Sequence, residues 1–193
     1  MMLRKFWILW NRLYFKILNI RIGHSSRICD KVYVKLKGDN KVSIGDNFAL
    51  SSGGGYNPLA RNIAASIELE KGAFIEVGDN VGMSSPCLWA YKFIKIGNSV
   101  KIGADTIIMD SDAHSLDYLQ RRNGATDRPN AQSKGITIED DVLIGTRCII
   151  LKGVSIGARS VIGSGSVVTK SIPADCIAAG NPCKVIKRIN DEC

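Results

Sequence analysis

Residues 136–170 read ITIEDDVLIGTRCIILKGVSIGARSVIGSGSVVTK, and this stretch decides the fold. An aliphatic residue recurs at every sixth position, and a second row, four residues after the first, holds only small or β-branched side chains. A period of six fits neither the 3.6-residue period of a helix nor the two-residue period of an ordinary strand. The first row is Ile138, Ile144, Ile150, Ile156, Ile162 and Val168. The second row is Val142, Cys148, Val154, Ser160, Ser166 and Ile172.

Short strands separated by tight turns explain this period. Gly145, Gly157 and Gly163 directly follow members of the aliphatic row, where a turn favours a residue without a side chain. If each hexad forms one flat side of a triangular coil, three hexads complete one turn of the coil. Coils about 4.8 Å apart would pair as strands and stack their aliphatic side chains in columns. The sequence therefore predicts an all-β coil with one continuous core.

The same period continues upstream, less regularly. Ile96, Ile102 and Ile108 form one ladder, and Ile44 and Val77, each followed by glycine, belong to earlier coils. We therefore expect coils from about residue 23 to residue 193, preceded by a separate N-terminal segment.

Two segments interrupt the ladder and are expected to leave the coil as loops. The first, at about residues 51–66, is rich in Gly and Pro. The second, at about residues 110–135, is polar and charged, and Pro129 disfavours a regular interior strand there.

Composition limits the classes of function. With 45% hydrophobic and 23% charged residues in 193, the chain is expected to form one folded domain. The net charge of +8 is concentrated in residues 1–29, which carry six basic residues and no acid. The remainder has 20 basic against 18 acidic residues, so no broad basic face is expected and nucleic acid is an unsuitable partner.

Cysteine and histidine usage points to a reducing, cytoplasmic setting without a metal. The six cysteines form no CxxC pair, and His24 and His114 are the only histidines. Neither a His-rich site nor a mixed Cys/His zinc site fits these spacings, so we expect no metal cofactor.

Several segments together resemble the hexapeptide-repeat acyltransferases, in particular the branch of galactoside, maltose and polysaccharide O-acetyltransferases. The resemblance covers about residues 40–190. It is carried by IGNSVKIG at 96–103, ITIEDDVLIG at 136–145, GVSIG at 153–157, VIGSGSVVTK at 161–170 and AGNP at 179–182.

This resemblance implies a left-handed parallel β-helix that assembles as a homotrimer with active sites between subunits. It further implies transfer of an acetyl group from acetyl-CoA to a hydroxyl of a sugar or glycan, in surface polysaccharide biosynthesis. Residues 178–189, after the last repeat, are expected to turn into a short C-terminal helix that covers the end of the coil.

His114 is the candidate general base. It lies six residues after Ile108, but the neighbouring Asp110, Ser111 and Asp112 would be costly to bury, so we expect the chain to have left the coil by this point. An imidazole with a pKa near neutrality can remove the proton of an attacking hydroxyl, and the similar family places its base here. His24 is interpreted as structural or incidental.

A nearby acid could hold this imidazole in one tautomer. Asp112 is the first candidate, with Asp110 and Asp117 behind it, and a solvated acidic turn is the alternative interpretation.

The substrate contacts follow from the resemblance. Ser84 matches a position where relatives often carry an asparagine that contacts the acceptor, so this contact is altered here. The acetyl-CoA contacts that the resemblance implies are Thr146, Ser164, Thr169, Lys170, Ala179, Gly180, Lys184 and Lys187.

Residues 1–22 are expected to contain an amphipathic helix with basic residues on its other face. Its charges exclude a membrane span, which leaves two roles. Residues 1–20 could lie on an anionic lipid surface, at the inner face of the membrane, or the helix could cap the first coil. The apolar positions are Leu3, Phe6, Trp7, Trp10, Leu13, Tyr14, Ile17 and Leu18.

Two other functions stay open at the level of sequence. N-acetylation of an amino sugar would use the same donor and the same base. A non-catalytic β-solenoid scaffold would need no base, and His114 in its acidic loop disfavours it.

Overall fold

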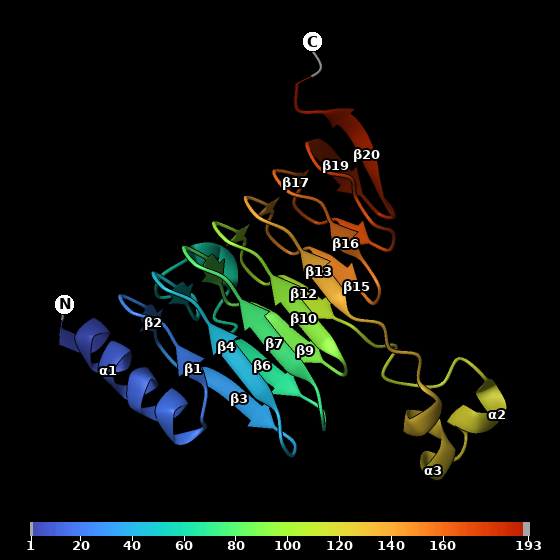
Figure 1. Cartoon of the computed structure of the whole chain (residues 1–193), viewed down its shortest axis with the longest axis horizontal. Coiled ribbons are helices and arrows are strands. Elements are labelled where there is room, and N and C mark those ends of the chain that lie inside the picture. The colour runs from blue at the N-terminus through green and yellow to red at the C-terminus, as the bar shows by residue number, and fades with distance from the viewer. Residues whose placement is uncertain (1, 191–193) are drawn as a thin grey trace.

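A computed structural model describes residues 2–190; Met1 and the last three residues of the expected coil region lie outside the described residues. Within that range, short strands wind into a three-sided prism (Figure 1). Neighbouring strands are parallel throughout except for the last pair, β19 and β20. Face A holds β1 (Arg21–Ile22), β4 (Lys41–Ile44), β7 (Phe74–Val77), β10 (Phe93–Ile96), β13 (Ile136–Ile138) and β16 (Ser155–Ile156). Face B holds β2 (Arg27–Cys29), β5 (Ala49–Ser51), β8 (Gly82–Ser84), β11 (Lys101–Ile102), β14 (Leu143–Ile144), β17 (Val161–Ile162), β19 (Cys176–Gly180) and β20 (Cys183–Arg188). Face C holds β3 (Val32–Leu36), β6 (Ala65–Leu69), β9 (Cys87–Ala90), β12 (Ile107–Met109), β15 (Ile149–Leu151) and β18 (Val167–Val168).

The chain passes from face A to face B to face C in each coil, and we name the corners between faces the AB, BC and CA edges. The fold is a left-handed parallel β-helix, which confirms the expected fold class.

The register shows how the repeat builds the core. Ile144 pairs with Ile162, 18 positions later, and Ile150 pairs with Val168, again 18 positions later. The aliphatic row is buried, and the second row is buried beside it. Its two serines remain hydrogen-bonded inside, because the Ser160 hydroxyl donates to the carbonyl of Pro173 and the Ser166 hydroxyl to that of Gly163.

Aspartate and asparagine side chains link successive coils at the AB edge. Each accepts a hydrogen bond from a backbone amide of the preceding coil, which fixes the spacing of the turns. The approach leaves no room for a side chain beneath it: a Cβ added at Gly78 would lie 2.6 Å from Asn98 Oδ1. The acceptors are Asp46, Asp79, Asn98 and Asp140, which bind the amides of His24, Asp46, Asp79 and Asn98 respectively.

Both expected loops leave the coil without disturbing its register. The first, between β5 and β6 at the BC edge, contains a 3-10 helix, Pro58–Ala60. The second, between β12 and β13 at the CA edge, contains α2 (Tyr118–Arg121), α3 (Gly124–Asp127) and the 3-10 helix Arg128–Asn130, and it projects from the prism (Figure 1). The strands after this loop return to the pairing that the hexads dictate, since β13 pairs with β10 and β14 with β11.

The N-terminal helix α1 (Met2–Ile17) ends earlier than residue 22. Asn19 adopts a left-handed conformation, with φ 53°, and its amide binds the carbonyl of Lys16. The amide of Ile20 binds the carbonyl of Phe15, and this pair of hydrogen bonds closes a helix C-terminus. Strand β1 can therefore begin at Arg21.

Helix α1 caps the first coil, the second of the two roles open for it at the level of sequence. Phe15 is fully buried against the end of the core. The Asn11 amide is also buried and donates to the carbonyls of Ile28 and Asp30, at 3.1 and 2.8 Å. Because β2 is the first strand of face B, these bonds satisfy backbone groups that no earlier coil could reach.

The expected short C-terminal helix is wrong. The chain forms β19 and β20, an antiparallel pair in which Ala179 lies opposite Lys184 and Gly180 opposite Cys183. The physical reason lies in the last coil: β19 pairs with β17 on one side and leaves an open row of backbone groups on the other. A strand satisfies that row directly, whereas a helix uses its own backbone groups internally.

Adjacent residues on β14 provide a test of the core. Ile144 is fully buried in the aliphatic column, whereas Leu143 is 46% exposed on face B. Ile144→Ala is expected to lower the free energy of unfolding by about 2–5 kcal/mol because it leaves a cavity. Leu143→Ala is expected to change it by less than about 1 kcal/mol. Urea unfolding measures both, and equal losses would contradict the inward assignment of the aliphatic row.

Candidate active site

His114 lies in the loop between β12 and β13, where the chain has left face C at the CA edge. Its Nδ1 is 2.6 Å from Oδ2 of Asp127, the last residue of α3. The other oxygen of Asp127 accepts the backbone amide of Ser115 at 2.8 Å. The His114 side chain is 59% exposed, while that of Asp127 is 12% exposed. The imidazole therefore stands outside the core, held from one side by a carboxylate.

Asp127 occupies the position that the sequence analysis predicted for Asp112, and the prediction is corrected accordingly. Asp112 Oδ1 instead pairs with Lys152 Nζ at 2.8 Å, across the base of the loop. Asp127 was missed because it is 13 residues from the histidine and the loop has no repeat pattern that would bring the two together. Only the fold of α2 and α3 places them side by side.

The two other acidic candidates have structural partners. Asp117 caps α2 by accepting the amide of Leu119 at 2.9 Å. Asp110 is fully buried, and burial raises the pKa of its carboxyl group, although three backbone amides that bind it act in the opposite direction. Those amides belong to Tyr91, Lys92 and Phe93, so Asp110 fixes the turn between β9 and β10.

Ser115 holds the folded loop together next to the histidine. Its hydroxyl donates to Gln120 Oε1 at 3.0 Å, and its carbonyl accepts from the Arg121 guanidinium at 2.6 Å. The hydroxyl of Thr126 donates to the carbonyl of Gln120 at 2.7 Å, which ties α3 to α2. These bonds make the segment that carries Asp127 an ordered unit within the predicted loop.

The electrostatics define which nitrogen of His114 is available. The hydrogen bond from His114 lowers the pKa of Asp127, so this carboxylate stays ionised near neutral pH and can only accept. The Nδ1 atom of a neutral imidazole must then carry the proton, and Nε2 keeps its lone pair. This arrangement can accept a proton from a group that approaches Nε2.

A second part of the candidate site is a shallow groove on face B, near the BC edge. It has a volume of about 460 Å³ and collects Ser84, Thr146 and Ser164, three residues that the sequence analysis assigned to substrates. The amide of Thr146 donates to Ser164 Oγ at 3.2 Å across adjacent coils. Ser84 Oγ accepts from the Asn57 amide at 3.0 Å, a contact from the first loop that the sequence did not indicate.

Glycine shapes the floor of this groove. Gly103 and Gly145 both line it, and a Cβ added at Gly145 would lie 2.5 Å from the amide nitrogen of Ser164. The small residues let the backbone of adjacent coils meet closely and leave a flat surface that a linear chain can approach.

The remaining predicted donor contacts divide between two edges. Ala179 and Gly180 end β19 on face B, and Lys184 on β20 lies opposite Ala179. Lys187 lies opposite Ile177 on the same pair of strands. These four residues lie on the last two strands of face B, outside the lining of the groove.

Thr169 and Lys170 lie elsewhere. They follow β18 and are exposed at the CA edge, the same edge from which the His114 loop departs. Face C, whose strands span up to five residues or about 16 Å, separates this edge from the BC edge. Within one chain, the histidine and the groove therefore occupy different edges of the prism.

Among residues 2–190, no three His, Cys, Asp or Glu side chains gather as a group that could hold a metal ion.

Comparisons with known proteins identify relatives of the repeat. A family model described as the hexapeptide repeat of succinyl-transferase matches residues 135–170. Galactoside O-acetyltransferase of Escherichia coli K12 is 43% identical over 98 residues, which cover 51% of this chain and 45% of that protein. This chain therefore spans less than half the length of that relative.

Longer matches come from two further proteins. An acetyltransferase-family protein of Staphylococcus aureus MRSA252 is 35% identical over 145 residues, which cover 65% of this chain and 70% of that protein. The crystal structure of a hexapeptide-repeat acetyltransferase from Vibrio cholerae, in complex with acetyl coenzyme A, has a TM-score of 0.51 and 27% identity. That match covers 94% of this chain and 78% of the other.

The contact between Asp127 and the loop predicts a change in proteolysis. The lowered pKa of Asp127 means that its contribution to loop order is present above the ordinary value of 3.8 and is lost as the pH falls through the lowered value. At pH 8, Asp127→Ala should therefore speed tryptic cleavage at Arg121 and Arg122 severalfold.

Asp117→Asn is the matched control, because asparagine caps a helix as well as aspartate does and cleavage should stay at the wild-type rate. Mass spectrometry of timed digests measures both variants. If Asp127→Ala is cut no faster than the wild type, Asp127 does not hold the loop.

Proposed function

Because this chain belongs to the hexapeptide-repeat acetyltransferase family, we propose that it transfers an acetyl group from acetyl-CoA to a hydroxyl of a sugar or glycan. The observation that carries the proposal is the pair formed by His114 and Asp127, which leaves Nε2 of an exposed imidazole free to accept a proton.

The proposed reaction is a direct transfer. The acceptor oxygen attacks the thioester carbonyl while Nε2 of His114 takes the hydroxyl proton. The resulting tetrahedral intermediate collapses when the carbon–sulfur bond breaks, and the imidazolium returns the proton to the departing thiolate of CoA. Asp127 stabilises the imidazolium between these two steps, since its carboxylate lies 2.6 Å from Nδ1.

The groove on face B is the proposed site of the donor. Its small lining residues Thr146 and Ser164 suit a pantetheine arm that passes along the coil surface. Ala179, Gly180, Lys184 and Lys187 extend this surface, and the two lysines place positive charge where anionic phosphates would lie. Ser84, at the other end of the groove, is proposed to contact the acceptor.

A homotrimer is part of the proposal, because one chain does not bring the base to the groove. A second copy that presents its CA edge to the first copy's face B would supply His114, Asp127, Thr169 and Lys170 together. Closed assemblies with this head-to-tail contact are cyclic, and three copies suit a three-sided prism.

A cytoplasmic location and a role in surface polysaccharide biosynthesis complete the proposal. In the described part of the chain all five cysteines are free thiols, which suits a reducing compartment. Within residues 2–190, no helix combines the length and the apolarity that crossing a bilayer requires. Contact of residues 1–20 with the inner face of the membrane belongs to the same proposal.

An acceptor screen tests the chemistry. Incubation with acetyl-CoA and a panel of sugars, amino sugars and glycans, read by the release of free thiol, should identify an acceptor whose hydroxyl is acetylated. His114→Ala should lower kcat by about 10²- to 10⁴-fold and leave the affinity for acetyl-CoA largely unchanged. Equal turnover by the two proteins would remove His114 as the base, and a product acetylated on nitrogen would replace the O-acetyl assignment.

The two aspartates give a sharper comparison. Asp127→Asn should lower kcat by less than His114→Ala does, because the base remains but loses its anionic partner. Asp112→Asn, which affects only the pair with Lys152, should keep kcat near the wild-type value. The opposite order of the two aspartate variants would restore Asp112 as the orienting acid.

A further inference from the structure

Helix α1 presents a second apolar face that the coil does not cover. One face carries the buried Phe15 and Asn11 and closes the prism. The other consists of Leu3, Phe6, Trp10, Leu13 and Ile17, whose exposed fractions range from 51% to 71%. We call this line of side chains the outer stripe.

The outer stripe is continuous along the helix. Its members recur at alternating intervals of three and four residues, the spacing that places side chains on one line. From the first member to the last it runs about 21 Å. Five large apolar side chains in one row on a single helix are an unusual feature of a solvated surface.

We infer that the outer stripe binds an anionic lipid surface, with α1 lying in the plane of the headgroups. This inference rests on the proposed contact of residues 1–20 with the membrane and assigns the surface that makes it, and it does not depend on the proposed acetyl transfer. Its occupant is a bilayer of anionic phospholipid.

Charge favours this occupant. Helix α1 contains Arg4, Lys5, Arg12 and Lys16 and no acidic residue. At 100° per residue, Lys5, Arg12 and Lys16 fall on one flank of the outer stripe, between it and the face packed on the coil. Basic side chains in this position reach lipid phosphates while the apolar row enters the acyl boundary.

The same flank continues into the first coil. An open hollow beside the end of α1 is lined by Arg12, Lys16 and residues 19–25, which include Arg21 and His24. Among the described residues, no aspartate or glutamate lines it. Such a hollow can hold a lipid phosphate group at the same depth in the headgroup layer as the basic side chains of α1.

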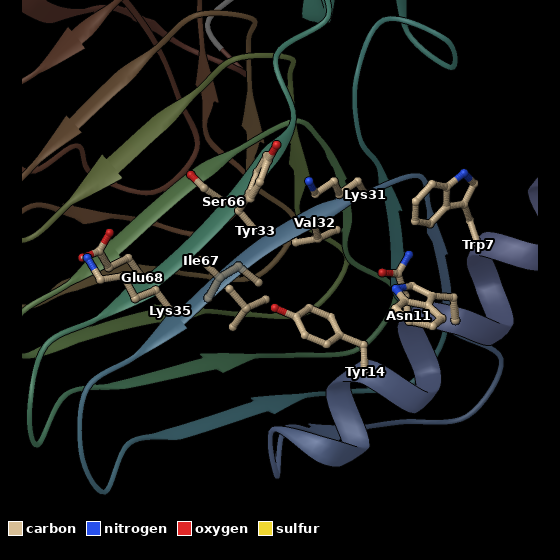
Figure 2. Close-up of a pocket in the computed structure, with 12 residues that line it drawn as sticks. Trp7, Asn11, Tyr14, Lys31, Val32, Tyr33, Lys35, Ser66, Ile67 and Glu68 are labelled. Carbon is tan, nitrogen blue, oxygen red and sulfur yellow. The ribbon is translucent and has the colours of Figure 1, made fainter.

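The opposite flank is aromatic. A groove of about 420 Å³ separates α1 from β3 and β6, and the side chains of Trp7 and Tyr14 from the helix and Tyr33 from β3 line it (Figure 2). Lys31 Nζ lies 4.4 Å from the centre of the Tyr33 ring, and Tyr33 is 54% exposed. Trp and Tyr concentrate where a protein meets the headgroup layer, because their rings are apolar and their edges are polar.

The groove also contains one acidic side chain, which is already neutralised. Glu68 pairs with Lys35 Nζ at 2.9 Å and with Lys37 Nζ at 3.5 Å. The groove therefore adds no unpaired negative charge beside the outer stripe.

A second copy of the chain is the less suitable occupant. Two α1 helices that met through their outer stripes would bring eight basic side chains together with no acid from either helix. An anionic bilayer supplies the opposite charge, and each basic residue near such a surface strengthens binding about fivefold.

Vesicle binding of the whole protein tests the inference without any acetyl donor. The probe is large vesicles of phosphatidylcholine with 30% phosphatidylglycerol, compared with phosphatidylcholine alone, in a flotation assay at about 0.1 M salt. The variant Trp10→Gln with Leu13→Gln removes two members of the outer stripe without affecting the buried face. Leu119→Gln with Ile186→Gln is the control, since both residues are exposed, at 60% and 65%, on α2 and β20, which lie apart from α1 (Figure 1).

The wild type and the control should float with the anionic vesicles and not with phosphatidylcholine alone. The Trp10/Leu13 variant should lose at least tenfold in partition, and Lys5→Gln with Lys16→Gln should lose about 25-fold and weaken the salt dependence. Circular dichroism and the thermal midpoint should match the wild type in every variant.

Equal flotation of the Trp10/Leu13 variant and the wild type would overturn the inference, as would equal binding to uncharged vesicles. Sedimentation velocity identifies the other occupant: if the Trp10/Leu13 variant changes the oligomeric state and leaves vesicle binding unchanged, the outer stripe is an interface between copies and the inference fails. Activity on a soluble acceptor is a separate readout, so its loss or retention bears on the proposed enzyme alone.

Discussion

Stacking of one coil on the next in a fixed register is the constraint on which this structure depends. Each strand binds its neighbours through parallel backbone hydrogen bonds, and these form only where the aliphatic column of one coil meets that of the next. The core of the prism must keep this register, whereas the corners between faces tolerate inserted loops. A loop that contains α2 and α3 interrupts the chain after β12, and β13 still pairs with β10. The fold can therefore carry His114 far outside the prism at no cost to its core.

Both ends of the stack would leave apolar side chains and backbone groups of the last coil uncovered, and a different element covers each end. At the N-terminal end, α1 covers the core with Phe15 and satisfies two carbonyls through Asn11. At the C-terminal end, β20 pairs with β19 and satisfies a whole row of backbone groups. A helix that packs one face on the core leaves its other face exposed along its whole length. The outer stripe lies on this exposed face of α1.

The sequence predicted what is local and periodic. The hexads identified the buried columns because Ile144 and Ile162 occupy the same inward-facing position of the repeat. They also located both loops, since a missing hexad marks where the coil is interrupted. The carboxylate partner of His114 could not be found in this way, because Asp127 reaches it only through the tertiary fold of a segment without any repeat. The final strand was missed because its pairing depends on an open sheet edge, which no spacing along the chain reveals.

The candidate site contains residues that the repeat could group and residues that it could not. Residues that stack along face B, such as Thr146 and Ser164, could be grouped from their separation of 18 positions, and the structure does group them. Thr169 and Lys170 follow in sequence but lie at the CA edge, the edge from which the histidine loop departs two coils earlier. Residues that are close in sequence, such as Ser164 and Thr169, therefore belong to two halves of the site, and these halves lie at different edges of one prism.

Mixing two inactive variants tests this division most directly. His114→Ala removes the base and keeps the groove, whereas Ser164→Trp fills the groove and keeps the base. Co-expressed with different affinity tags and purified as mixed assemblies, they should regain about a third of the wild-type turnover, since one of the three interfaces in every mixed trimer joins an intact base to an intact groove. Mixed assemblies that contain both chains and remain inactive would contradict an active site shared between copies.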